Sequence, residues 1–133
     1  MLVDTSAWVE WLRGTGANTD LALRAMLDRD EDLATTGLVV QEVLQGCRDE
    51  RQAADLKVLL TGLRCLDPVY PQTFEHAAAL FRRCRRAGRT VRGTVDCLVA
   101  ALAIEHDLPL LARDRDFESL QAVCGLRLNA DGR

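Results

Sequence analysis

The sequence predicts an α/β domain in which helices cover both faces of a mostly parallel sheet. Short apolar runs alternate along the chain with longer amphipathic stretches, which is the pattern of repeated strand–helix units. One late stretch, residues 97–104, is apolar on every side and therefore predicts a buried helix. With 133 residues the chain has the length of one domain, so we expect residues 1–133 to form a single unit.

The first half of the chain is expected to start with a strand that runs into a helix. The apolar N-terminal residues end at Asp4, and Ser6 is the expected N-cap of the helix that follows. Asn18 or Thr19 would cap a second helix, and Thr36 a third. We therefore expect strands near residues 1–4 and 32–35, and helices near residues 6–14, 18–28, 37–46 and 50–63.

The second half is expected to add two strands, three helices and an edge strand. Pro71 stands where the start of a helix tolerates proline, and Thr94 is the expected N-cap of the apolar helix. We expect strands near residues 64–66, 110–112 and 126–128, and helices near residues 71–87, 94–106 and 117–123.

The composition is that of a globular chain without an export or membrane signal. Hydrophobic residues make up 48 % and charged residues 28 %. No apolar run approaches the ~20 residues of a membrane span, and the N-terminus lacks the features of a signal peptide. The five cysteines lie among apolar neighbours without a C-x-x-C pair, which favours reduced, buried thiols. We expect a cytoplasmic protein with no membrane partner.

A cluster of arginines contrasts with the net charge of −3, which by itself argues against indiscriminate nucleic-acid binding. Six arginines fall within eleven residues just before the apolar helix: Arg82, Arg83, Arg85, Arg86, Arg89 and Arg92. Such a cluster suits either a solvated helix face or contact with a phosphate backbone, and the sequence leaves both interpretations open.

Carboxylates stand at the ends of several predicted elements. Asp4 ends the first strand, Glu42 lies in the third helix, Asp96 opens the apolar helix, and Asp114 and Asp116 follow the fourth strand. Each acid alone has an ordinary explanation; the helix dipole, for example, favours an acid in the first turn by about 0.3–1 kcal/mol. Together, however, three of them fall at the carboxyl edge of a parallel sheet, where ligands bind.

Carboxylates gathered at one edge would need protons or a cation. Two unit charges 4 Å apart repel by roughly 4 kcal/mol at an effective dielectric of 20. Oxygen ligands without nearby histidines or paired thiols select a hard ion such as Mg²⁺ or Mn²⁺. Such an ion lowers the pKa of bound water and stabilises charge on a phosphoryl group during hydrolysis.

Four segments in order resemble the acidic motifs of PIN-domain ribonucleases. They are Val3-Asp4-Thr5-Ser6, Gln41-Glu42-Val43, Thr94-Val95-Asp96 and Leu110-Leu111-Ala112-Arg113-Asp114-Arg115-Asp116-Phe117. Their order and spacing, and the chain length, look most like the VapC toxins of bacterial toxin–antitoxin pairs. The resemblance implies a three-layer α/β/α sandwich and an endoribonuclease that requires Mg²⁺ or Mn²⁺.

The resemblance also implies roles for individual residues. The catalytic acids would be Asp4, Glu42, Asp96 and Asp114, and the same four with Asp116 would be the metal ligands. Thr5, Ser6 and Thr94 would support the site, and Arg85, Arg86, Arg89 and Arg92 would contact RNA. Ala112 departs from the pattern, because a small hydroxyl residue often stands there in the family. Whether Asp114 or Asp116 is the main fourth acid stays open.

The family further implies protein partners. Its members usually form homodimers and are held inactive by a small antitoxin, here a VapB-like protein, whose tail lies in a groove between helices. Trp8, Trp11 and Leu12 on the first helix are the candidate antitoxin contacts. Tryptophans at helical spacing equally well predict packing into the core.

Two other classes of phosphate-handling protein need residues that this sequence lacks. A phosphatase of the haloacid dehalogenase type would need an aspartate where Ser6 stands, and a lysine on a late strand, whereas Lys57 falls in a helix. A P-loop is absent from the sequence. A metal-dependent DNA nuclease of the same fold and a catalytically idle RNA- or protein-binding module remain as alternatives, because the choice of RNA depends on the resemblance.

Overall fold

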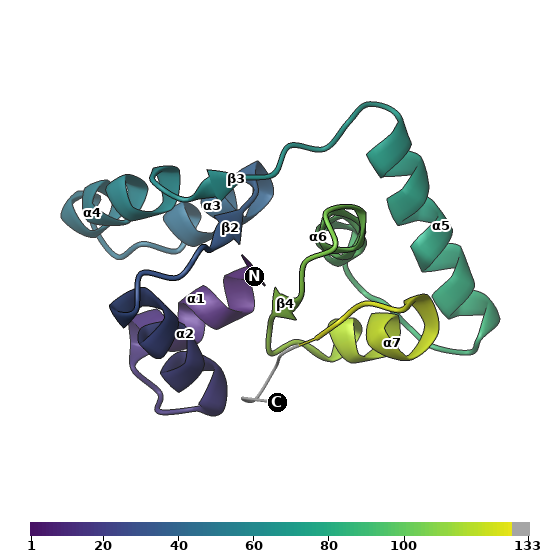
Figure 1. Ribbon diagram of the computed structural model, residues 1–133, viewed down its shortest axis with the longest axis horizontal. Coiled ribbons are helices and arrows are strands. Elements are labelled where there is room, and N and C mark those ends of the chain that lie inside the picture. Colours follow the sequence, from purple (N-terminus) through teal and green to yellow (C-terminus); the bar gives the residue numbers. More distant parts are fainter. Residues whose placement is uncertain (129–133) are drawn as a thin grey trace.

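The centre of the structure is a parallel four-stranded sheet (Figure 1). The computed structural model describes residues 1–128, so residues 129–133 of the predicted domain lie outside the described part. The strand order is β3-β2-β1-β4, and all three pairings are parallel. The strands are β1 (Leu2–Val3), β2 (Ala34–Thr35), β3 (Arg64–Cys65) and β4 (Leu110–Leu111). The predicted parallel α/β architecture is confirmed.

Seven helices within the described residues cover the two faces of this sheet. They are α1 (Thr5–Arg13), α2 (Asn18–Asp28), α3 (Gly37–Gln45), α4 (Glu50–Thr61), α5 (Gln72–Arg86), α6 (Thr94–Glu105) and α7 (Arg115–Cys124). Figure 1 shows α1 to α4 on one side of the strands and α5 to α7 on the other. The three-layer α/β/α arrangement is therefore the one expected.

The order of the strands creates a switch point between β1 and β4. The chain runs outward from β1 through β2 to β3, and then returns through α5 and α6 to place β4 on the other side of β1. Crossovers that leave one strand in opposite directions open a crevice at the carboxyl ends of the two central strands. The residues that follow β1 and β4 thus meet at this edge.

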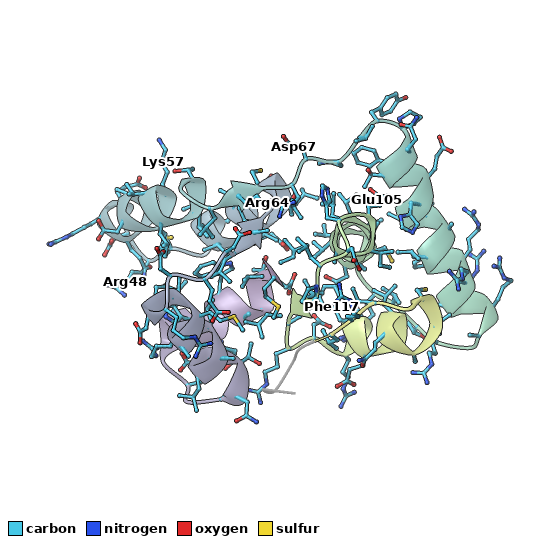
Figure 2. The ribbon with its side chains drawn as sticks, viewed as in Figure 1. Arg48, Lys57, Arg64, Asp67, Glu105 and Phe117 are labelled. Carbon is cyan, nitrogen blue, oxygen red and sulfur yellow. The ribbon has the colours of Figure 1, made fainter. Side chains whose placement is uncertain are left out.

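The core is formed mainly by the strands and α6. Both residues of β1 and both residues of β4 are buried, and α6 is buried continuously from Cys97 to Ala103. The predicted apolar helix is therefore the central helix of its layer, and side chains fill the space around it (Figure 2). No helix within residues 1–128 combines the length and apolar character that crossing a membrane requires.

The N-cap predicted for α1 is wrong. Asp4, and not Ser6, is the cap residue: its backbone is extended, and its side chain accepts a hydrogen bond from the Ser6 backbone N–H at 2.9 Å. An aspartate is as good an N-cap as a serine, and Asp4 comes first along the chain, so the helix begins earlier than predicted. The Ser6 hydroxyl instead contacts the Asp4 carboxylate and the Arg113 backbone.

The N-caps predicted for α2 and α6 are also wrong. Ala17 precedes α2 in place of Asn18 or Thr19, and it makes no side-chain cap bond. The Asp20 carboxylate in the first turn accepts from the Gly16 N–H at 2.9 Å, which holds the chain just before the helix. Gly93 precedes α6, so Thr94 is its first helical residue. Thr36 does occupy the N-cap position of α3, but without a side-chain cap bond.

The predicted edge strand at residues 126–128 is reduced to a single bridge. Leu128 pairs with Leu110 in parallel, and the Leu110 N–H donates to the Arg127 carbonyl at 2.9 Å. The Arg127 side chain also donates to the backbone carbonyl oxygen of Asp107 at 2.6 Å and to its carboxylate at 2.9 Å. The segment therefore closes the β4 edge of the sheet with one short contact.

Candidate active site

Strand β1 delivers Asp4 to the carboxyl edge of the sheet beside β4. Its backbone N–H donates to the Leu111 carbonyl at 2.9 Å, and the residue is only 5 % exposed. Burial raises the pKa of Asp4 above its ordinary value, and the Glu42 carboxylate adds to that rise. Hydrogen bonds from Ser6 oppose it. Asp4 is thus an acid held in a place that disfavours its charge.

The Ser6 hydroxyl joins Asp4 to the loop that follows β4. Its oxygen accepts from the Arg113 backbone N–H at 2.9 Å and donates to Asp4 Oδ2 at 2.7 Å. Because a hydroxyl has one proton, accepting from Arg113 leaves that proton directed at Asp4. Ser6 therefore ties together two segments that lie far apart in the sequence.

Helix α3 brings Glu42 to the start of α1. The Thr5 hydroxyl donates to Glu42 Oε1 at 2.8 Å, and the Glu42 side chain is otherwise exposed. This bond holds Glu42 on the same side of the sheet edge as Asp4. Thr5 is therefore both the first residue of α1 and the residue that orients the Glu42 carboxylate.

Three aspartates gather where α6 and α7 begin. One carboxylate oxygen from each of Asp96, Asp114 and Asp116 lies within 4.8 Å of the others. Asp114 is the N-cap of α7, and its Oδ1 accepts from the Asp116 backbone N–H at 3.0 Å. Asp116 is buried, and its Oδ2 accepts from the Arg92 backbone N–H at 3.0 Å. The Arg92 Nε also lies 3.7 Å from Asp116 Oδ1.

Asp96 lies where a negative charge is disfavoured. The pKa of Asp96 is raised to about 8, first by burial, then by a hydrogen bond to Asp116, and then by the charges of Asp4, Asp114 and Asp116. The Asp96 carboxyl therefore keeps its proton well above the pH at which an ordinary aspartate loses it. The effect of Asp4 on Asp96 links the β1 acid to the cluster.

Gly93 leaves room for the Asp96 carboxylate. A Cβ atom at this position would come within 3.3 Å of Asp96 Oδ2. The Gly93 backbone has a negative φ of −108°, so the available space, and not the backbone conformation, is what a larger residue would disturb. No local sequence pattern indicates this contact, because it depends on the position of the first turn of α6.

The donors suit a hard divalent cation. All are carboxylate oxygens, which Mg²⁺ and Mn²⁺ prefer. Burial raises the pKa of Asp96 most, and the charges of Asp4, Asp114 and Asp116 add to it; a bound cation would offset both effects. Asp96, Asp114 and Asp116 form the group closest together, and Asp4 lies within electrostatic reach of it.

The sequence also matches a known family. Residues 1–123 match the model of the PIN domain. The chain belongs to the PIN-domain family. Over 128 residues, 96 % of either chain, this PIN domain is 38 % identical to Ribonuclease VapC11 of Mycobacterium tuberculosis. It has the same identity and coverage with VapC ribonuclease Mb1587 of Mycobacterium bovis. The predicted VapC-type membership is confirmed.

Solved structures share the PIN fold at low sequence identity. VapBC2 from Rickettsia felis, bound to a promoter DNA fragment, matches with a TM-score of 0.73 and 16 % identity over 97 % of this chain and 96 % of that one. Mycobacterium tuberculosis VapC20, described as a toxin that cleaves the sarcin–ricin loop, matches with a TM-score of 0.65 and 22 % identity over 95 % and 98 %. These likenesses support the fold of this PIN domain.

The arginine cluster of this PIN domain lies at the C-terminal end of α5 and in the loop after it. Arg85, Arg86 and Arg89 are exposed, and the Arg85 guanidinium lies 5.8 Å from the centre of the Phe81 ring. Arg92 differs, because it contacts Asp116 and so borders the acidic cluster directly. The cluster thus extends from α5 to the edge of the site.

The structure contradicts Trp8 as a surface contact. Trp8 is 0 % exposed and packs in the core, with its ring centre 5.6 Å from that of Trp11 in an edge-on arrangement. Trp11 is half-buried, whereas Leu12 is exposed. With Leu56, these two residues help line a cavity of about 280 Å³ between α1 and α4 of the PIN domain.

Proposed function

We propose that this PIN-domain protein is a VapC-type toxin, a divalent-metal-dependent endoribonuclease that cleaves cellular RNA and is neutralised by a cognate antitoxin. The observation that carries the proposal is the acidic cluster at the switch point, where carboxylate oxygens of Asp96, Asp114 and Asp116 lie within 4.8 Å of one another and within electrostatic reach of the buried Asp4. The VapC ribonucleases among its relatives support the choice of RNA.

Each acid has a proposed role. Asp4, Glu42, Asp96 and Asp114 are the catalytic acids, and together with Asp116 they would hold Mg²⁺ or Mn²⁺. When bound, the ion supplies a Lewis acid that lowers the pKa of attacking water and stabilises charge on the phosphoryl group. Asp114 is the stronger candidate for the fourth acid, since Asp116 is more buried and its second oxygen already lies 3.7 Å from the Arg92 Nε.

The hydroxyl residues position these acids. Ser6 fixes Asp4 against the loop that carries Asp114, and Thr5 holds Glu42. Thr94 lies exposed at the start of the helix that carries Asp96, which places it at the rim of the site. Their contribution is preorganisation: the acids need little rearrangement when substrate and ion bind.

RNA cleavage with a DNA control tests the proposal. We expect the purified protein to cut single-stranded RNA in Mg²⁺ or Mn²⁺, to leave DNA of the same sequence intact, and to lose activity in EDTA. Mapping the new RNA 5′ ends checks that cleavage is internal and discrete. Cleavage of DNA at the same rate would instead favour the DNA nuclease alternative.

We propose that the exposed arginines bind the RNA backbone. Replacing Arg85, Arg86 and Arg89 with glutamine should weaken RNA binding in EDTA and flatten its dependence on salt, by up to about 0.7 in log–log slope for each lost phosphate contact. Fluorescence anisotropy at several salt concentrations measures that slope.

A matched variant controls for the lost charge. Arg13, Arg29 and Lys57 are also exposed, but lie on α1, after α2 and on α4. Replacing these three with glutamine removes the same charge and should leave the slope nearly unchanged. Equal slopes for the two triple variants would show that the arginine cluster does not contact the RNA backbone and is only a solvated helix face.

We propose the cavity between α1 and α4 as the antitoxin contact. Trp11, Leu12 and Leu56 present apolar surface there, and Arg48 and Arg51 lie beside them. An amphipathic segment of a VapB-like protein would place apolar side chains on this surface.

The five cysteines are free thiols, which suits the proposed action in the cytoplasm.

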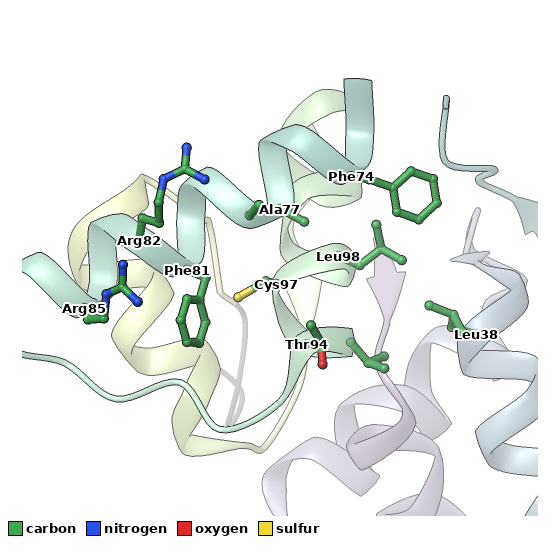
Figure 3. Close-up of a pocket in the computed structure, with 11 residues that line it drawn as sticks. Leu38, Phe74, Ala77, Phe81, Arg82, Arg85, Thr94, Cys97 and Leu98 are labelled. Atoms are coloured by element: carbon green, nitrogen blue, oxygen red, sulfur yellow. The ribbon is translucent and has the colours of Figure 1, made fainter. Parts of the chain in front are cut away.

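A homodimer is proposed through a second surface. An apolar cavity of about 580 Å³ lies between α5 and the start of α6, lined by Leu38, Phe81 and Leu98 among others (Figure 3). Phe74 and Phe81 on its rim are 45 % and 37 % exposed. A second copy of the chain would cover these rings. Light scattering of the purified chain measures its molar mass in solution, and therefore whether it forms a dimer.

A further inference from the structure

Three cysteines lie between α5, α6 and α7 on one face of the sheet, and none of them has a role in the proposed active site. Cys84 of α5 and Cys97 of α6 are buried, and Cys124 at the end of α7 is half-buried. The Cys84 Sγ lies 4.0 Å from the Ser119 carbonyl oxygen of α7, and the Cys124 Sγ lies 4.0 Å from the Leu80 carbonyl oxygen of α5. Each thiol therefore points at the helix that carries the other.

The reciprocal contacts place the two sulfurs in the same space between α5 and α7. Each sulfur lies against the backbone of the helix that carries the other, about one turn before the other cysteine. We propose that Cys84 and Cys124 form a dithiol that low-molecular-weight disulfides oxidise to an intramolecular disulfide joining α5 to α7.

The oxidation proceeds by two thiol–disulfide exchanges. The Cys124 thiolate attacks one sulfur of glutathione disulfide, forms a mixed disulfide, and releases one glutathione. Cys84 then loses its proton and attacks the Cys124 sulfur, and the second glutathione leaves as a thiolate that takes up a proton. In sum, two protein thiols and one glutathione disulfide become one protein disulfide and two glutathione molecules.

The environments of the two sulfurs set the order of these steps. Cys124 is partly exposed, so the oxidant reaches it first, whereas Cys84 is fully buried. Burial and the neighbouring Cys124 raise the pKa of Cys84 to about 11. Few Cys84 thiolates are present at neutral pH, so the second step is the slow one and speeds up as the pH rises.

The disulfide would enclose most of the acidic cluster within one covalent loop. Residues 84–124 contain α6, β4 and α7, and with them Asp96, Asp114 and Asp116. Closing a loop of this length restricts the unfolded chain, and we expect the Tm to rise on the order of 5–10 °C. The cross-link thus stabilises the half of the protein that carries three of the acids.

Cys97 provides the competing outcome. Burial and then the charge of Cys84 raise the pKa of Cys97, so the two thiols are near neighbours, but Cys97 is buried and offers no surface to an oxidant. A Cys84–Cys97 bond would have to form without the exposed first step at Cys124. The proposal therefore predicts one connectivity among the three cysteines.

Glutathione disulfide and the full chain test the proposal. After oxidation and alkylation, peptide mapping should find Cys84 linked to Cys124, with the Tm rise reversed by dithiothreitol. Cys124→Ser should abolish both the link and the Tm rise, while Cys65→Ser, an exposed cysteine on the far side of the sheet, should keep them. A Cys84–Cys97 link, a mixed disulfide that stays on Cys124, or no reaction would each overturn the proposal.

Discussion

Replacing Asp4 with asparagine is expected to lower RNA cleavage by at least about 100-fold while the fold stays intact. Asparagine has the size of aspartate and is an equally good N-cap, so it can still accept hydrogen bonds from the Ser6 N–H and hydroxyl. What it loses is the negative charge at the carboxyl edge of β1. The expected loss is therefore one of catalysis and metal binding, and not of folding.

Asp49 offers a matched control for this substitution. It is the N-cap of α4, and its carboxylate accepts from the Gln52 N–H at 2.8 Å, just as Asp4 caps α1. Asp49→Asn makes the same chemical change outside the acidic cluster and should leave the cleavage rate unchanged. Initial rates and thermal melting of both variants are the measurements. Full activity in Asp4→Asn would remove Asp4 from the catalytic acids.

Replacing Asp96 with asparagine is expected to stabilise the metal-free protein near pH 8. In the folded state the pKa of Asp96 is about 8, well above its ordinary value of 3.8. The folded protein therefore binds this proton more tightly than the unfolded chain does. The free energy of unfolding should fall as the pH rises from about 4 to about 8 in EDTA. Asparagine cannot ionise, so the variant escapes that loss.

The size of this effect is limited by solvent. Asp96 is only partly buried, so screening reduces the gain in free energy of unfolding to the order of 1–2 kcal/mol at pH 8. The charges of Asp4, Asp114 and Asp116 also raise the pKa of Asp96, so the measured transition would belong to the group of acids and not to Asp96 alone.

Urea unfolding at pH 5 and pH 8 in EDTA measures the difference between Asp96→Asn and the natural chain. Asp55→Asn, on the exposed surface of α4, is the control and should change neither value. Added Mg²⁺ should stabilise the natural chain more than Asp96→Asn. If Asp96→Asn is less stable at both pH values, Asp96 has a structural role instead.

The sequence was sufficient for the parts of the fold that depend on local pattern. The alternation of apolar runs predicted the parallel sheet, and the apolar stretch at residues 97–104 predicted the buried α6. The predicted caps failed by one or two residues, because Asp4 and Gly93 compete with their neighbours for the same position. Of the two interpretations left open for Trp8, the structure supports core packing and contradicts surface contact; helical spacing alone does not show which side of a helix faces the sheet.

The site depends on contacts that no local pattern carries. The acids were visible as carboxylates at the ends of elements, but the bond from the Arg113 N–H to the Ser6 hydroxyl joins residues 107 positions apart. The space that Gly93 leaves for Asp96, and the capture of Asp116 by the Arg92 backbone, likewise exist only in the folded chain. The sequence therefore predicted the candidate acids, but not the contacts that hold them in position.

Restoration of RNA cleavage by a divalent ion tests the central claim most directly. The purified protein is first treated with EDTA, and cleavage of single-stranded RNA is then followed as Mg²⁺ or Mn²⁺ is added back, with Asp4→Asn in parallel. We expect no cleavage in EDTA, recovery with either ion, and no recovery in the variant. Cleavage that persists both in EDTA and in Asp4→Asn would contradict a metal-dependent mechanism at this acidic cluster.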